Sequence, residues 1–282
     1  MIFFESVMIP VTLLVLLIAT YTDLKTREVP DSLNYGLLFA ALGLRGIWAV
    51  EEGWTFFLSG ILGAAAAFLL ASVLYYTRQW GGGDAKLLLA LGAVLGISYP
   101  FTISSLTLLW FLVAVLAAGA LYGLIWIMVM AWHRKKEVLP HFKTMVHRFR
   151  TTHIITGFLS LLFLIITFFV HFLWPLLFLP LGFFYLFLLV QSVEKECFYR
   201  RRAAHHLTEG DWLAEDIVVE GKTVLTKKTL EKEDLEKVRT LEKERKISSV
   251  LIKEGIPFVP SFLIGYLLLL IGVERVSAFL AL

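Results

Sequence analysis

The sequence is poor in cysteine and in charged residues. Its 282 residues include one cysteine, Cys197, which excludes a disulfide framework and a cysteine-rich zinc site. Only 17% of the residues are charged, whereas a soluble domain has about a quarter. The formal net charge of +3 is small, so the placement of the basic residues is more informative than their sum. We expect no nucleic-acid partner.

Apolar residues dominate instead, at 58% of the chain with 14% aromatic, which is typical of a membrane protein. A transmembrane helix needs roughly 20 mainly apolar residues. Eight segments approach this length: 5–22, 33–50, 56–77, 85–97, 103–131, 153–173, 176–193 and 257–273. The fourth is short, so we expect it to tilt, to lie between other helices or to continue toward the fifth. Trp174-Pro175 predicts a tight hairpin between the sixth and seventh, because proline cannot continue a helix.

Loop charges predict how these segments cross the membrane. The first apolar run lacks the positive start of a signal peptide, carries Glu5 and is followed by Lys25 and Arg27. We therefore interpret it as a transmembrane helix with its N-terminus outside the cell. With this orientation the basic loop residues face the cytosol, as in most multi-pass proteins: Lys25, Arg27, Arg78, Lys86, Arg134, Lys135, Lys136, Lys143, Arg148 and Arg150.

The chain divides into four parts by composition. We expect a membrane core over 1–131, a basic cytosolic loop with an extra membrane hairpin over 132–193, a cytosolic subdomain over 194–256 and a final transmembrane helix over 257–282. In the subdomain, a Glu220-Gly221 turn predicts two short strands, and the run from Lys227 to Lys246 predicts an amphipathic helix. The predicted fold is an all-α polytopic membrane protein of about 6–8 helices with a small cytosolic α/β subdomain.

Two aspartates lie at membrane boundaries of this predicted topology. Asp23 ends the first helix and Asp84 begins the fourth, so both are expected on the cytosolic side. Ionisable residues in such places are functional candidates. If the two helices pack together, one carboxylate can ionise while its neighbour stays protonated. Such a pair can activate water and hydrogen-bond a scissile carbonyl, which is the chemistry of an aspartic protease.

Three glycines, Gly81, Gly82 and Gly83, precede Asp84. Glycine lets a peptide backbone approach closely and accepts positive φ angles, which suits a substrate-binding approach to the carboxylate. The spacing does not match that of a phosphate-binding loop. A flexible loop before a helix is the alternative interpretation of the glycines.

These residues resemble a known family. Gly81-Gly82-Gly83-Asp84 is similar to the G-x-G-D signature of membrane aspartyl proteases, and Thr22-Asp23-Leu-Lys-Thr-Arg-Glu-Val-Pro30-Asp-Ser-Leu33 resembles the first catalytic motif of prepilin peptidases. The combination resembles the archaeal preflagellin and prepilin signal peptidases. The resemblance is clear over residues 5–100. It is weaker at Glu209-Gly210-Asp211 and at Phe258-Val259-Pro260-Ser261-Phe262-Leu263-Ile264-Gly265.

The resemblance implies that Asp23 and Asp84 are the catalytic pair. Pro30 matches the family's proline seven residues after the first aspartate, and Lys86 matches a lysine that commonly follows the second motif. Lys86 is equally well interpreted as a cytosolic anchor of its helix. Bacterial members carry a cysteine-rich zinc region and methylate their product; this chain lacks those cysteines, so we expect no methyltransferase activity, no metal and no cofactor.

The expected function is cleavage of short basic leaders from archaellin or pilin-like precursors with class III signal peptides. We expect a multi-pass protein of the cytoplasmic membrane, in contact with membrane lipid, with its active site at the cytosolic face. One alternative is a presenilin-like protease that cuts within transmembrane helices. Another is a proton-coupled transporter that uses the aspartates as a relay. Glu209, Asp211, Glu215 and Asp216 are interpreted as a solvated acidic face or as a contact for the basic leader.

Overall fold

The computed structural model of the protein describes residues 2–170 and 176–280. These residues form two compact units, which are described separately. The first unit combines Met1–Gly123 with Ile256–Leu282, and the second covers Leu124–Gly255. The C-terminal helix is therefore part of the same unit as the N-terminal helices.

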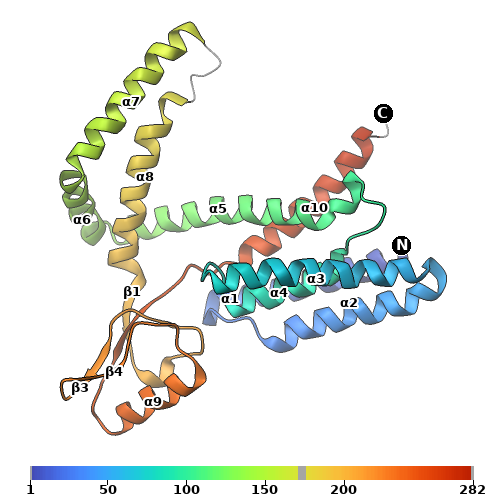
Figure 1. Ribbon diagram of the computed structural model, residues 1–282, viewed down its shortest axis with the longest axis horizontal. Helices are drawn as coiled ribbons and strands as arrows, with labels where there is room; N and C mark the ends of the chain where they lie inside the picture. The colour runs from blue at the N-terminus through green and yellow to red at the C-terminus, as the bar shows by residue number, and fades with distance from the viewer. Residues whose placement is uncertain (1, 171–175, 281–282) are drawn as a thin grey trace. The chain divides into compact units, whose positions relative to one another are not determined.

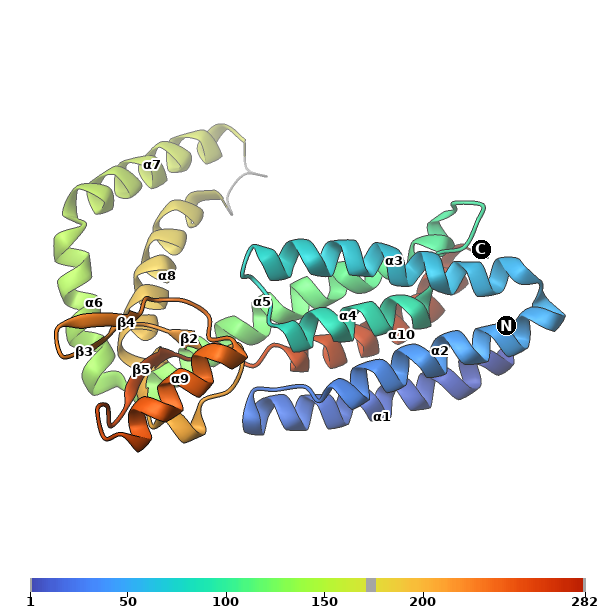
Figure 2. The ribbon, with the colours of Figure 1, turned by 60° about the horizontal axis from the view of Figure 1, so that its bottom comes forward.

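Long helices lying side by side make up the first unit (Figures 1 and 2). They are α1 (Ile2–Thr26), α2 (Asp31–Glu52), α3 (Trp54–Tyr76), α4 (Gly82–Leu95), the first part of α5 (Thr107–His133) and α10 (Val259–Leu280), with the short η1 (Ile103–Leu106) before α5. Helices α2, α3 and α4 pack against one another, and α1 packs against α2 and α10. Their contact faces bury large apolar side chains that include Leu16, Leu88, Leu91, Phe111 and Phe262.

Five of the described helices are long and apolar enough to cross a membrane: Phe3–Thr26, Asp31–Glu52, Trp54–Tyr76, Thr107–His133 and Arg150–Thr167. The other expected segments form α4, α8 (Leu179–Val193) and α10, whose apolar stretch Val259–Gly272 is shorter. The protein is mostly helical and multi-pass, with a small strand-containing subdomain. The predicted fold class is thereby confirmed.

Helix α4 lies between other helices, which decides among the three arrangements considered for the fourth segment. Its 14 residues are buried on all sides beyond the first turns, as expected of a helix that is apolar all round. Close approach to α3 depends on Gly63 and Gly92, because a Cβ on Gly63 would lie 2.2 Å from the carbonyl oxygen of Gly92. The helix ends at Gly96, whose φ of +70° suits glycine.

The second unit begins with the end of α5 and continues with three further helices, of which the first corrects a prediction. Residues expected as a basic loop form α6 (Lys135–Arg148), which is followed by α7 (Arg150–Phe169) and α8. Helix α6 forms because Val138 packs against Val193 and Cys197, giving it a buried face. Helices α7 and α8 pack against each other. The turn predicted at Trp174-Pro175 lies outside the described residues.

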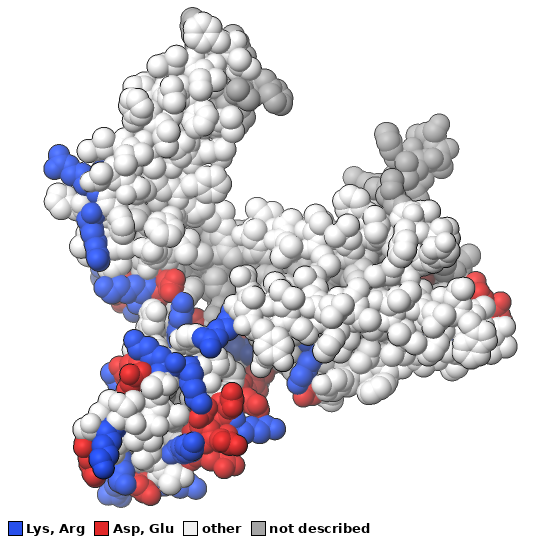
Figure 3. Space-filling model, viewed as in Figure 1, with Lys and Arg blue, Asp and Glu red and all other residues white. Residues whose placement is uncertain are grey.

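The strand-containing subdomain follows a π-helical turn, η3 (Glu194–Phe198), and contains α9 (Lys232–Lys243). Strands β1 (Tyr199–Arg202), β5 (Val250–Lys253) and β2 (Trp212–Leu213) form an antiparallel sheet in the order β1-β5-β2. The predicted hairpin is confirmed as β3 (Ile217–Val219) and β4 (Lys222–Leu225), with positive φ at Glu220 and Gly221. The predicted amphipathic helix is α9, which buries Leu235 and Val238. Charged side chains gather over this subdomain in Figure 3.

Candidate active site

Asp23 lies in the last turns of α1 and is 6% exposed. Its Oδ2 accepts a hydrogen bond of 2.9 Å from the backbone N–H of Val259, which is the first residue of α10. Helix N-termini carry unpaired N–H groups and a partial positive charge, so a carboxylate there is stabilised. Pro260 follows without a donor of its own, as is usual at the start of a helix. Asp23 thus holds together two helices from opposite ends of the chain.

Asp84 lies in the first turn of α4 and is partly buried. Its Oδ2 accepts a hydrogen bond of 3.2 Å from the backbone N–H of Gly81. Gly81 has a φ of −73°, and Gly82 and Gly83 are already helical. The expected positive φ angles are therefore wrong. Glycine suits position 83 because it has no side chain: a Cβ there would lie only 3.2 Å from Cβ of Val29.

Both aspartates belong to the same end of the helical bundle. The C-terminal end of α1, the N-terminal end of α4 and the start of α10 lie together in both views (Figures 1 and 2). Burial, and to a lesser extent the negative charge of Asp23, raise the pKa of the Asp84 carboxyl to about 7, although the hydrogen bond from the Gly81 N–H acts in the opposite direction. The two carboxylates are therefore close enough to influence each other, which is the requirement for an acid–base pair.

The raised pKa of Asp84 predicts a pH-dependent stability. The unfolded carboxyl loses its proton near pH 3.8, whereas the folded one keeps it up to about pH 7. Between these values the folded state binds more protons, so stability falls as pH rises and the loss is complete above about pH 7. We expect the melting temperature in detergent to be higher at pH 5 than at pH 8, and Asp84→Asn to flatten this difference by stabilising the protein at pH 8. The control is Glu209→Gln, whose melting temperature should depend on pH as that of the wild type does. The same pH dependence of the melting temperature in wild type and Asp84→Asn would contradict this account.

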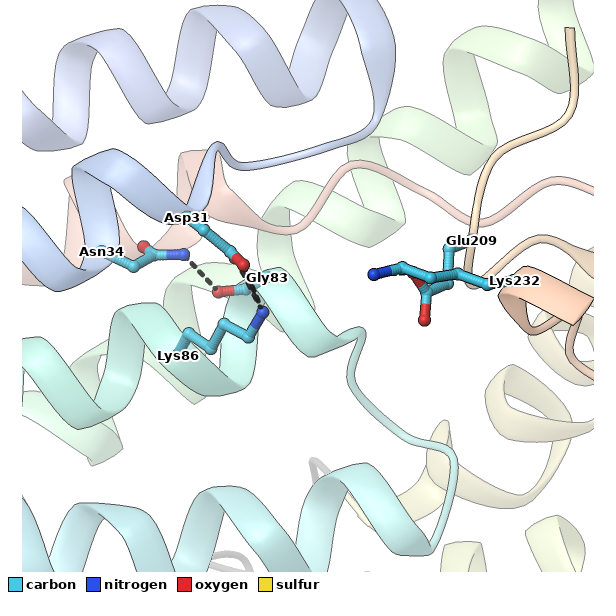
Figure 4. A network of polar contacts seen from close by, with 6 residues as sticks. All are labelled: Asp31, Asn34, Gly83, Lys86, Glu209 and Lys232. Carbon is cyan, nitrogen blue, oxygen red and sulfur yellow. Dashed lines mark hydrogen bonds and ion pairs between the residues drawn. The ribbon is translucent and has the colours of Figure 1, made fainter.

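Polar contacts join the start of α2 to the start of α4 (Figure 4). Lys86 Nζ lies 2.7 and 2.8 Å from the two carboxylate oxygens of Asp31. Nδ2 of Asn34 donates a hydrogen bond of 3.4 Å to the carbonyl oxygen of Gly83. We call Asp31, Asn34, Gly83 and Lys86 the clasp. The ion pair of Glu209 with Lys232, 3.9 Å apart and also drawn in Figure 4, belongs to the other unit and is exposed.

The structure locates the remaining predicted site residues around the clasp. Pro30 precedes the first residue of α2, and its carbonyl oxygen accepts the N–H groups of Leu33 and Asn34. Lys86, for which two interpretations were considered, forms an ion pair with Asp31. Asp31 and Leu33 stood in the quoted motif without a role, and Asn34 was missed. Among the described residues, no group of three His, Cys, Asp or Glu side chains has the arrangement of metal ligands.

Sequence comparisons bear on the same segment. Residues 11–127 match the model of the type IV leader peptidase family. A Methanothermobacter thermautotrophicus protein described as "Prepilin peptidase EppA" is 25% identical over 182 residues, covering 58% of this chain. The aligned part is 47% of that protein, so the chain spans about half the length of this curated relative. No solved structure matches the chain. The resemblance to the prepilin and preflagellin peptidases is thereby confirmed. The segment matched by the family model holds both Asp23 and Asp84.

Proposed function

We propose that this protein is a membrane aspartic endopeptidase that removes short basic leaders from archaellin or pilin-like precursors. The observation that carries the proposal is that Asp23 and Asp84 lie at the same end of the bundle. There the negative charge of Asp23 is one of the causes that raise the pKa of Asp84. The family match and the similarity to a prepilin peptidase support the same activity.

The two carboxyl groups divide the work of hydrolysis. The ionised carboxylate takes a proton from water as the water oxygen bonds to the scissile carbonyl carbon. The protonated carboxyl gives its proton to the carbonyl oxygen, which produces a neutral tetrahedral diol. When the carbon–nitrogen bond breaks, the protonated carboxyl gives its proton to the leaving nitrogen. At the same time one diol hydroxyl gives its proton to the other carboxylate and becomes the carbonyl oxygen of the product acid. The pair then holds one proton again, so neither a metal nor a covalent intermediate is required.

The substrate's apolar helix lies beside the bundle in the bilayer, with its leader at the cytosolic boundary. Lys25, Arg27, Arg78 and Lys86 support this orientation, because basic loop residues favour the cytosolic side. Basic leaders are attracted to the same anionic membrane surface. The cut then falls at the boundary rather than within the transmembrane helix.

Purified protein in lipid nanodiscs, incubated with several archaellin-like and pilin-like precursors, tests this proposal. We expect one cut between the basic leader and the apolar helix, identified by sequencing the mature N-terminus. A cut inside the apolar helix would indicate the presenilin-like alternative. Proton-coupled uptake into proteoliposomes without any cleavage would overturn the peptidase proposal. The mass of the mature N-terminus tests the absence of methyl transfer.

A further inference from the structure

The clasp surrounds Asp84 along the chain, because Gly83 precedes this aspartate and Lys86 follows it by two residues. Residues three apart on a helix share a face, so Gly83 and Lys86 both face α2, where Asn34 and Asp31 hold them. Neighbouring helical residues point about 100° apart. The contacts of Gly83 and Lys86 therefore determine the direction in which Asp84 points.

The clasp also connects the two aspartates by a short path. Asp23 lies in the last turns of α1, and only residues 27–30 separate α1 from Asp31 at the start of α2. This loop packs on α4, because a Cβ on Gly83 would meet both Cβ and N of Val29 within 3.4 Å. A shift of α4 relative to α2 would change the separation of the two carboxylates.

Asn34 carries a feature that a purely structural residue seldom has. The residue is 1% exposed, and its Oδ1 is buried without a hydrogen-bond partner in the described structure. A buried acceptor without a partner is costly, so its presence in a native structure calls for an explanation. The Nδ2 group of the same amide donates to Gly83. Asn34 thus orients the peptide that leads into Asp84 at some expense of stability.

We infer that the clasp is a positioning device that sets the direction and separation of Asp84 relative to Asp23. This inference rests on the proposed peptidase function. Asp31, Asn34 and Lys86 act through Asp84 and are positioning residues rather than catalytic ones. Errors in the placement of reacting groups lower the catalytic rate strongly while substrate affinity changes little.

Charge exchange across the clasp tests the ion pair. Asp31→Lys and Lys86→Asp should each lower kcat for leader cleavage about tenfold or more, with KM nearly unchanged. The double exchange should restore most of the activity, because the pair re-forms with reversed sign. The matched controls are Glu244→Lys and Lys246→Glu in an exposed ion pair of the other unit, 2.7 Å apart, and both should cleave like wild type. Wild-type kcat in both single variants, or no recovery in the double variant, would overturn the inference.

Asn34→Leu tests the amide in a way that separates positioning from folding. Leucine has a similar size but neither donates to Gly83 nor retains the unpartnered oxygen. We expect kcat to fall about tenfold while the melting temperature stays the same or rises. A fall in melting temperature with unchanged kcat per folded molecule would show a structural role only. Asp84→Asn in the same assay separates the two proposals: an inactive Asp84→Asn beside fully active clasp variants overturns the clasp alone, and an active Asp84→Asn overturns the peptidase mechanism.

Discussion

Asp23→Asn and Asp84→Asn are each expected to lower leader cleavage by about a thousandfold or more while the protein still inserts and folds. Asparagine has nearly the same shape as aspartate, but it can neither accept a proton from water nor donate one to a carbonyl oxygen at neutral pH. Loss of a general acid or base typically removes between about 10² and 10⁴ in rate, and here one substitution disables a shared pair. The measurement is the first-order rate of precursor conversion with enzyme in excess.

Two comparisons make this prediction specific. Glu244→Gln removes a carboxylate from the exposed pair with Lys246 and should leave the rate unchanged. Asp23→Ala should be as inactive as Asp23→Asn but less stable by about 1–3 kcal/mol, because alanine leaves the buried N–H of Val259 without its acceptor. Processing at near wild-type rate by either asparagine variant would end the two-carboxylate mechanism.

Arg45→Ala is expected to produce the largest loss of stability. Arg45 is 4% exposed and lies on α2, where its guanidinium donates to the carbonyl oxygens of Ala93 and Val94 at 2.9 and 2.8 Å. These carbonyls belong to the last turn of α4, where no further helical turn supplies donors. The guanidinium also donates to the carbonyl of Phe56 and the hydroxyl of Ser59. Arg45 therefore supplies hydrogen-bond donors to the buried C-terminal end of α4.

Removing this side chain leaves several buried acceptors without partners, at about 1–3 kcal/mol each, so we expect a total loss of roughly 3–5 kcal/mol. It also removes the contact of the guanidinium with the rings of Phe4 and Phe56, whose centres each lie 4.7 Å from it. Arg45→Lys should recover only part of this stability, since one ammonium cannot reproduce the planar fork of donors. The measurement is thermal unfolding in mild detergent, with Lys237→Ala in the exposed part of α9 as the control. Equal melting temperatures for wild type and Arg45→Ala would contradict the assignment.

The position of Arg45 also affects how α4 presents Asp84. The clasp holds the first turns of α4, and Arg45 holds its last turn, so both ends are attached to α2. Between them the helix is surrounded by apolar side chains. A helix attached at both ends in this way keeps its first turn, and therefore Asp84, in one orientation.

Local patterns in the sequence predicted most of the helices, the β3–β4 hairpin and the position of the candidate site. Long apolar runs predicted the helices, because burial of that many apolar side chains without a polar face suits lipid. The Glu220-Gly221 turn and the spacing of Leu235 and Val238 predicted β3, β4 and α9, because turn geometry and helical periodicity act over a few residues. The motifs around Asp23 and Asp84 identified the candidate site for the same reason.

Contacts between distant segments were decided only by the tertiary structure. No local pattern indicates that the Asp23 carboxylate accepts the N–H of Val259, 236 residues away, that Asn34 donates to Gly83, or that Arg45 donates to the carbonyls at the end of α4. Helix α6 was likewise missed, because its stability depends on packing Val138 against residues of α8 and η3. The sequence by itself indicated which residues are the candidates for the chemistry. The tertiary structure decided how they are held, because hydrogen bonds across helices depend on three-dimensional packing and leave no periodic trace along the chain.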